Sequence, residues 1–446
     1  MIDETRQIAL KTLYKIEKEK AYSNIALNET LNENRKKLNN KDIGLISEIV
    51  YGVTTWKLTL DEIIKKYSKI KVKKISPWII NILRMGIYQI IFLDKVPKSA
   101  AVNESVNLAK RYGHKSSSNF VNAILRKVEK EDLEELNNIE NNIERISKTT
   151  SMPEWIVEEL LKEKTVEETE KICQNYNKKP NLTIRINNLK ISKEELEKQL
   201  EKANIEFEEG ILEDFLVLKK IKNIENLELF KKGYFSIQDE AAGFTTIVLN
   251  PQKGDYVLDA CSAPGGKTTY MAQWMQNEGK IEAWDIYDHR IKLIKENANR
   301  LGIKIIQTNI NDATIYKEEY KEKFDKILLD VPCLGIGVMK RKPDIKWQRK
   351  QEDINEITKI QYQILEKCSK YLKKGGELVY STCSIFKEEN EEIIKKFIKN
   401  YPEFKIANYN IKQNNYFYKY IEDEKYLKVY PNENTDGFFI CKIILQ

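Results

Sequence analysis

Hydrophobic positions at helical spacing fill the first third of the chain. Between Arg6 and Lys18, apolar residues recur every three or four positions, which predicts an amphipathic helix. The same spacing continues from Asp42 to Tyr67 and from Pro77 to Leu93, and a proline suits the first turn of a helix. We therefore predict an all-α bundle over residues 1–135, completed by helices over 103–112 and 118–129, with an acidic, asparagine-rich exit linker over 131–142.

A mixed pattern follows over residues 145–235. Apolar and polar residues alternate from Leu182 to Ile186, which indicates a strand, and Phe215–Leu218 is a second short apolar run. Ser192 followed by Glu195 is typical of a capping box and predicts a helix that continues to Ala203. These elements predict a small α/β module of an RNA-recognition-like kind.

Strands and helices alternate through the last part, 236–446. Helices are expected from about residue 266, up to Leu301 and over 351–372. The strands that precede or follow them are Tyr256–Ala260, Lys280–Ile286, Ile303–Thr308, Phe324–Val331 and Glu377–Tyr380. This alternation predicts a doubly wound, Rossmann-like parallel sheet, which binds ligands at the carboxyl ends of its strands.

Composition excludes two classes of protein. With 41% hydrophobic and 32% charged residues in 446, the chain is neither an integral membrane protein nor wholly disordered. Its longest apolar stretch, Trp78 to Leu93, contains Asn81, Arg84 and Gln89 and is shorter than the ~20 residues that a membrane span needs. The N-terminus lacks the apolar segment of a signal peptide, so we expect a cytoplasmic protein.

Charge is distributed unevenly along the chain. Residues 1–130 contain 25 Lys+Arg and 13 Asp+Glu, a net +12, whereas the remainder carries 50 − 55 = −5. A basic first third favours a polyanionic partner such as nucleic acid.

A glycine-containing turn follows the first strand of the predicted sheet. Its residues are Cys261, Ser262, Ala263, Pro264, Gly265, Gly266 and Lys267, followed by Thr268. A phosphate loop would require glycine at position 261, so an NTPase is excluded. A strand, a tight turn and a helix N-terminus instead indicate a site for a nucleoside-type cofactor. By the same logic Asp285 would bind the ribose hydroxyls, and Asp312 would accept from an adenine amino group.

Two of the six cysteines lie at predicted strand ends. Cys333 follows Asp330-Val331-Pro332, and Cys383 follows Thr382. Either thiol can act as a nucleophile at this edge, and the residues alone do not choose between them. The other cysteines are assigned to packing, and neither they nor the two isolated histidines have the spacing of a metal site. These remaining cysteines are Cys173, Cys368 and Cys441.

Several of these motifs resemble the RNA cytosine-5 methyltransferases that use S-adenosylmethionine. The resemblance is carried by residues 236–240, 261–268, 330–333, 342–347, 382–384 and 436–439. The first third resembles the NusB-like RNA-binding domain of one subgroup, the bacterial 16S ribosomal RNA methyltransferases. Its markers are residues 81–89, 101–106 and 120–126. One departure is Val331, where the family usually has alanine.

The resemblance implies a cofactor, a substrate and roles for the site residues. S-adenosylmethionine would occupy the 261–267 turn with Asp285, Asp312 and Asp330, and C5 of a cytosine in 16S rRNA, cytosine 967 in the usual rRNA numbering, would be methylated. Cys383 would attack the base and Cys333 would assist product release. Asp330 would hydrogen-bond the cytosine, and Lys267 would lie near it.

Further expectations concern the partners. The substrate would be 16S rRNA or an early small-subunit assembly intermediate, bound by a monomer with no metal and no membrane. The segment 340–347, which interleaves basic residues with Trp347, is expected to line the RNA path. A transfer RNA methyltransferase and a non-catalytic NusB-like RNA-binding factor are the alternatives. The intact 261–267 turn and both cysteines speak against the second.

Overall fold

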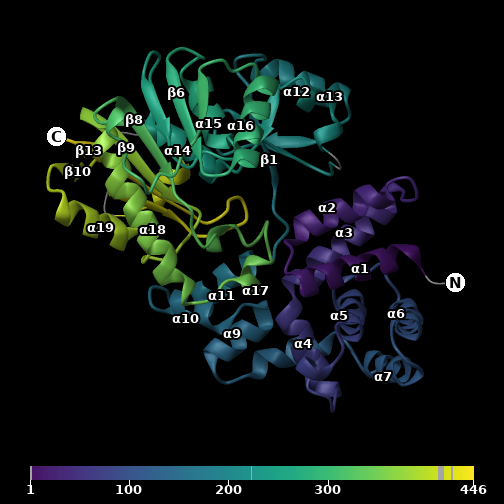
Figure 1. Ribbon diagram of the computed structural model, residues 1–446. Coiled ribbons are helices and arrows are strands. Elements are labelled where there is room, and N and C mark those ends of the chain that lie inside the picture. The colour runs from purple at the N-terminus through teal and green to yellow at the C-terminus, as the bar shows by residue number, and fades with distance from the viewer. Residues whose placement is uncertain (1–2, 222–223, 410–415, 423–424) are drawn as a thin grey trace. The chain divides into compact units, whose positions relative to one another are not determined.

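The computed structural model describes residues 3–221, 224–409, 416–422 and 425–446. These residues form two units, which are described separately below (Figure 1). The first unit runs to Lys178 and also includes the later segment Met339–Gln351. The second unit consists of Lys179–Val338 and Glu352–Gln446. The chain therefore leaves the second unit once, directly after one of the cysteine-bearing strand ends, and then returns to it.

Helices build the first unit. Helix α5 is buried along almost its whole length and packs against α1, α3, α4, α6 and α7, as its continuous apolar sequence requires. Pro77 begins it, as predicted. The helices are α1 Glu4–Glu19, α2 Ser23–Asn34, α3 Asn40–Thr55, α4 Lys57–Tyr67, α5 Pro77–Phe92, α6 Lys98–Tyr112, α7 Lys115–Leu125, α8 Glu131–Glu135, α9 Asn142–Thr150, α10 Glu154–Leu161, α11 Val166–Asn175 and α17 Ile345–Gln348.

Two predictions for this unit are wrong in detail. The helical stretch from Asp42 to Tyr67 is two helices, because the backbone at Trp56 leaves helical geometry where its ring stacks on Phe92 at 4.6 Å. The acidic exit linker contains helix α8. Asp132 accepts hydrogen bonds of 2.6 Å from Lys66 and from Tyr67, so its carboxylate neutralises a lysine of α4.

A four-stranded antiparallel sheet, in the order β2-β3-β1-β4, begins the second unit. Ser192 caps α12 by accepting from the Glu195 amide, which confirms the predicted helix start. One face of the sheet packs on α12 through alternating apolar residues such as Ile184 and Leu216. The elements are β1 Leu182–Ile186, α12 Lys193–Lys202, β2 Phe207–Glu209, β3 Phe215–Leu218, α13 Glu228–Lys231 and β4 Phe235–Ile237.

The opposite face of this sheet is covered by the following domain. Phe215 packs edge to face with Tyr270 of α15 at 5.8 Å, and Arg185 is fully buried beside it. An RNA-recognition fold stacks bases on an open sheet face. The predicted small α/β module is present, with the β-α-β-β-α-β order of a ferredoxin-like fold, but the sheet face on which an RNA-recognition fold stacks bases is covered here.

The predicted doubly wound sheet follows. Strands β9-β8-β5-β6-β7 are parallel, with α14, α15 and α16 on one face and α18 and α19 on the other (Figure 1). Neighbouring strand residues point to opposite faces, so Leu328 joins one core and Leu329 the other. The elements are α14 Glu240–Leu249, β5 Tyr256–Asp259, α15 Gly266–Trp274, β6 Lys280–Asp285, α16 Asp288–Leu301, β7 Ile306–Ile310, β8 Phe324–Asp330, α18 Asp353–Cys368, β9 Leu372–Thr382 and α19 Glu391–Asn400.

Antiparallel strands at the C-terminus extend this sheet, which the sequence did not predict. Strand β13 pairs with β9 from Phe439 opposite Thr382 to Ile444 opposite Glu377. These strands are β10 Phe404–Ile406, β11 Ile421–Glu422, β12 Tyr426–Val429 and β13 Phe438–Leu445. Short 3₁₀ helices are η1 Val72–Lys74, η2 Leu136–Asn138, η3 Ile224–Asn226, η4 Glu318–Tyr320, η5 Ile336–Val338, η6 Ser369–Tyr371 and η7 Tyr416–Tyr420. Within the described ranges, no helix has the length and apolar character to cross a membrane.

Candidate active site

The 261–267 turn joins β5 to α15 at the carboxyl edge of the parallel sheet. The Ser262 amide and hydroxyl both donate to the Trp284 carbonyl, at 2.9 and 2.8 Å, which ties the turn to β6. Gly265 closes the turn with a 2.7 Å bond to the Ser262 carbonyl and has φ +98°, a conformation that favours glycine. Helix α15 therefore starts directly at the strand ends, as a nucleoside-binding turn requires.

A buried carboxyl lies beneath this turn. Asp259, the last residue of β5, accepts a 2.7 Å bond from the Thr268 hydroxyl, while its second oxygen has no partner among the described residues. Burial raises the pKa of Asp259 to about 7, against the opposing effect of the Thr268 bond. The sequence gives no reason to select Asp259, because in the sequence it is only a polar residue at the end of an apolar strand.

The two predicted cofactor aspartates lie at neighbouring strand ends. Asp285, at the end of β6, is 7% exposed; one oxygen accepts from the Tyr287 amide and the other lies 3.8 Å from Arg290. Asp312 follows β7, is exposed, and accepts from both the amide and the hydroxyl of Thr314. Asp312 thus caps its own turn, and the roles of both residues toward a cofactor remain predictions.

Lys267 and Asp330 form an ion pair at the centre of the edge. The Lys267 ammonium lies 2.7 Å from one Asp330 oxygen, and the Ser381 hydroxyl donates to the other at 3.0 Å. Burial alone would lower the pKa of Lys267, but the Asp330 carboxylate raises it, so the lysine stays charged. Residues from α15, β8 and β9 thereby meet, although they are far apart in sequence.

The two cysteines of the strand ends are in contact. Cys333 Sγ lies 2.9 Å from Cys383 Sγ, at a distance that lets one thiol donate to the other. This hydrogen bond, together with burial, raises the pKa of Cys333 above its usual range. The Gly337 amide donates to the Cys383 carbonyl at 2.8 Å, and the Gly437 amide in turn donates to the Gly337 carbonyl. A Cβ at Gly337 would lie 2.1 Å from the Gly437 carbonyl oxygen, so this contact requires glycine.

Arg185 connects the small module to the turn. Its guanidinium donates to the Gly266 carbonyl at 2.7 Å, to the Thr269 hydroxyl at 3.1 Å and to Gln238, and it lies over the Tyr270 ring. Burial lowers the pKa of Arg185 to about 9. The strand pattern around Arg185 contains no signal that would have identified this contact.

The segment expected to line the RNA path instead lies inside the helical unit. Lys346 is 1% exposed and donates to the Asn177 side-chain oxygen at 2.6 Å. The Trp347 indole donates to the Thr54 carbonyl at 2.7 Å, and Asp344 accepts from Ser23 at 2.6 Å. The prediction is wrong for these residues, because their polar atoms are bonded within the protein.

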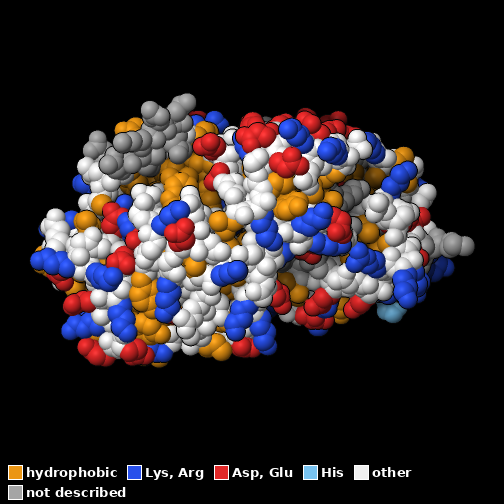
Figure 2. Space-filling view, turned by 90° about the horizontal axis from the view of Figure 1, so that it is seen from above, with side chains coloured by type: hydrophobic (Ala, Val, Ile, Leu, Met, Phe, Trp, Pro, Cys, Tyr) orange, Lys and Arg blue, Asp and Glu red, His pale blue; other side chains and the backbone are white. Residues whose placement is uncertain are grey.

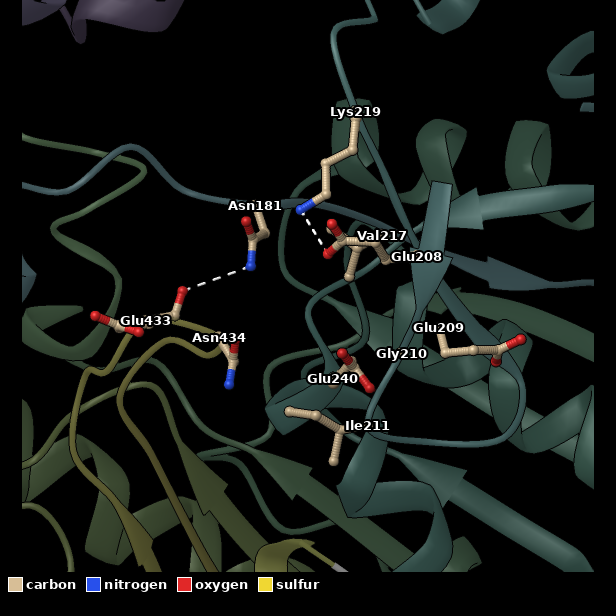
Figure 3. A pocket seen from close by; sticks show the side chains of 10 residues that line it. All are labelled: Asn181, Glu208, Glu209, Gly210, Ile211, Val217, Lys219, Glu240, Glu433 and Asn434. Atoms are coloured by element: carbon tan, nitrogen blue, oxygen red, sulfur yellow. Dashed lines mark hydrogen bonds and ion pairs between the residues drawn. The ribbon is translucent and has the colours of Figure 1, made fainter. Parts of the chain in front are cut away.

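A separate cavity of about 330 Å³ lies beside the small module (Figure 3). Glutamates dominate its lining, and its Lys219 is paired with Glu208 at 2.8 Å. An acidic cavity repels phosphate, and none of the strand-end residues described above lines it. The lining residues are Asn181, Glu208, Glu209, Gly210, Ile211, Val217, Lys219, Glu240, Glu433 and Asn434.

The fold and the strand-end site define a Rossmann-like methyltransferase with a ferredoxin-like module and a helical N-terminal domain. Family models support each part. Residues 246–444 match the 16S rRNA methyltransferase RsmB/F model, 3–130 match the NusB family, and 152–225 match the RsmF/B-like ferredoxin-like domain.

Curated relatives match over nearly the whole chain. The probable ribosomal RNA small subunit methyltransferase B of Bacillus subtilis is 38% identical over 98% of both chains. The ribosomal RNA small subunit methyltransferase B of Shewanella oneidensis is 33% identical over 88% of this chain and 89% of its own. The chain belongs to the RsmB/F family of S-adenosylmethionine-dependent ribosomal RNA methyltransferases.

Solved structures agree with this assignment. The crystal structure of PH0851 matches with a TM-score of 0.82 at 28% identity, covering 100% of this chain and 99% of its own. NSun6 from Pyrococcus horikoshii with SFG matches with a TM-score of 0.57 at 25% identity, covering 66% of this chain and 98% of its own. The predictions of family, fold class and cofactor are confirmed.

Proposed function

We propose that the protein methylates C5 of a cytosine in 16S rRNA, cytosine 967 by family resemblance, through a covalent cysteine adduct. The observation that carries the proposal is the meeting of four side chains at one sheet edge: Cys333, Cys383, Asp330 and Lys267. A thiol pair beside a charged Lys–Asp pair provides a nucleophile and hydrogen-bonding groups for a polar base.

The chemistry of cytosine requires such a nucleophile. C5 is too weakly nucleophilic to accept a methyl group directly, whereas a thiolate added at C6 makes C5 enamine-like. An ordinary cysteine of pKa ~8.5 is only a few per cent thiolate at neutral pH. Lowering this pKa by ~1.5 units takes about 2 kcal/mol of local stabilisation. We assign the attack to Cys383 by resemblance to the RNA methyltransferases with Thr-Cys-Ser. The contact with Cys383 and burial raise the pKa of Cys333, which agrees with this assignment.

The neighbouring groups have matching roles. Asp330 accepts from the cytosine edge and orients the base, and Lys267, paired with Asp330, supplies positive charge beside the ring. After methyl transfer, the C5 proton passes to water and the Cys383–C6 bond breaks. The Cys333 thiol, donating to Cys383 Sγ, stabilises the departing thiolate.

The turn and its surroundings fit the cofactor. At Gly266 a Cβ would meet only Gln238 Nε2, at 3.9 Å, so the start of α15 allows close approach of a ligand. When bound, S-adenosylmethionine supplies an electrophilic methyl group. We assign its binding to the turn and to the aspartates at the strand ends, as Cys261, Ser262, Ala263, Pro264, Gly265, Gly266, Lys267, Asp285, Asp312 and Asp330.

The choice of ribosomal over transfer RNA rests on the first unit. Its NusB-family match and the net +12 of residues 1–130 favour a large RNA, 16S rRNA or an early small-subunit assembly intermediate, bound by a monomer. On the face shown in Figure 2, Lys and Arg side chains are interspersed with acidic ones. It is therefore the net charge of residues 1–130, and not a continuous basic patch, that favours RNA as the partner.

The test is transfer of labelled methyl groups from S-adenosylmethionine to unmodified 16S rRNA, resolved on a denaturing gel. We expect Cys383→Ala to lose transfer and form no adduct, and Cys333→Ala to accumulate a covalent protein–RNA band. Cys173→Ala, a buried cysteine of the helical unit, serves as the matched control. The reverse pattern between Cys333 and Cys383 would overturn the role assignment, and transfer to transfer RNA alone would overturn the substrate.

A further inference from the structure

Glu389 lies between the two loops that carry the cysteines. It is fully buried and follows Cys383 by six residues, just before α19. One carboxylate oxygen accepts from the Leu334 amide, directly after Cys333, at 3.0 Å. The other accepts from the hydroxyl of Ser384, directly after Cys383. A single side chain therefore bonds to the residue that follows each thiol.

Gln361 of α18 completes the arrangement. Its side-chain amide donates to Glu389 at 3.0 Å and to the Pro332 carbonyl at 2.9 Å, so the peptide before Cys333 is held as well. The Tyr380 hydroxyl donates to the Glu389 carbonyl at 2.7 Å. The Leu334 amide, the Ser384 hydroxyl and the Gln361 amide all donate to the carboxylate oxygens of Glu389, which is the pattern that an ionised carboxylate requires.

The next residue, Asn390, holds the second loop. Its side-chain oxygen accepts from the Thr382 hydroxyl at 2.6 Å, and its side-chain amide donates to the Ser384 carbonyl at 3.1 Å. Both neighbours of Cys383 are thus fixed against the start of α19. Both cysteine loops, whose sulfur atoms lie 2.9 Å apart, are therefore bonded to the short segment 389–390.

Resting on the proposed function, we propose that Glu389 is a positioning residue that gives the two cysteines their different roles. Glu389 sets the spacing of their loops, and its buried negative charge disfavours the thiolate form of Cys333. Cys333 therefore remains the hydrogen-bond donor, and Cys383 is free to attack. The sequence alone left this choice open, because both thiols follow strand ends.

The charges around the thiols support this division. The contact with Cys383 and burial raise the pKa of Cys333, and the negative charges of Glu389 and Asp330 raise it further. Lys267 is bonded to Asp330 and so partly offsets the charge of that aspartate. The buried Tyr380 is affected in the same direction, since burial and Glu389 raise its pKa.

Glu389→Gln is the most direct test, because it removes the charge and retains the shape. The glutamine oxygen can accept from Leu334 and Gln361, and its amide can donate to the Ser384 hydroxyl. We expect the pH profile of Cys333 alkylation by iodoacetamide, read by peptide mass spectrometry on the full chain, to move to lower pH by about one unit. With 16S rRNA, the covalent band should increase and kcat should fall, while KM for S-adenosylmethionine stays within about twofold.

Two further variants separate charge from structure. Glu392→Gln removes an exposed charge one helical turn away and should leave the profile unchanged. Ser384→Ala removes one bond of Glu389 but retains the charge of Glu389, so the pH profile of Cys333 alkylation should also stay unchanged.

An unchanged profile in Glu389→Gln, with a normal circular dichroism spectrum, overturns the proposal. Since alkylation needs no RNA, failure of the proposed substrate or reaction would leave this result readable. If Glu389→Gln does not fold, a profile that moves in Ser384→Ala overturns the role of charge.

Discussion

Two lysines, one in each unit, show opposite effects of their surroundings on the charge of an amine. Lys267, at the sheet edge, has the Asp330 carboxylate at 2.7 Å and stays charged. Lys346, in the segment Met339–Gln351, is bonded to Asn177, and within the described residues no carboxylate lies at ion-pair distance from it. Burial lowers the pKa of Lys346 to about 7.

The difference shows how a buried amine is used. A lysine paired with a carboxylate keeps its charge and can act on a substrate, whereas one surrounded by neutral oxygens is partly deprotonated and serves packing. Only five residues separate Cys333 from Met339, where the chain changes units. Closeness in sequence to a reactive cysteine is therefore not evidence of a role in the chemistry.

Asp330→Asn is the substitution from which we expect the largest loss of activity. It removes the counter-charge of Lys267 and the acceptor proposed for the cytosine edge, so we expect kcat to fall by about 10²–10⁴. Labelled methyl transfer to 16S rRNA measures the effect. Asp325→Asn, on the same strand and paired with Lys373, is the matched control and should stay within a fewfold of the wild type. Equal losses in the two variants would contradict a special role for Asp330.

Trp347→Ala tests the structural side of the comparison. It removes a half-buried ring and its bond to the Thr54 carbonyl, so we expect a loss of about 2–3 kcal/mol in the free energy of unfolding of the helical unit. Urea unfolding, monitored by hydrogen exchange in α3 and α4, measures this loss of stability. Binding of S-adenosylmethionine, which involves the other unit, should be retained. If Trp347→Ala is stable but binds RNA more weakly, the segment 340–347 contacts RNA after all.

Lys346 gives the smallest effect, and it depends on pH. Its pKa is about 7 in the folded protein and 10.5 ordinarily, so between these values the unfolded chain binds one more proton. Stability therefore rises with pH across this range. Relative to Lys346→Met, the wild type should gain about 1–2 kcal/mol between pH 7 and pH 8.5 in urea titrations. A gain of the same size in Lys346→Met would show that another group is responsible.

Local sequence patterns were sufficient to predict many of the secondary-structure elements of this protein and several residues at their ends. The parallel strands, the turn at Gly265, the cap at Ser192 and the strand-end positions of Cys333 and Cys383 all follow from periodicity and turn chemistry within a few residues. These signals are local because helix and strand periods, caps and tight turns involve near neighbours in the chain.

Only the tertiary structure decided which polar groups are buried and against what. Lys346 bonds to a residue 169 positions away, and Arg185 reaches the Gly266 carbonyl 81 positions away. Glu389 joins the two cysteine loops, and the C-terminal strand β13 completes the sheet beside β9. A lysine or glutamate in isolation reads as a solvated surface residue, because its burial depends on partners that only the folded chain brings within hydrogen-bond distance.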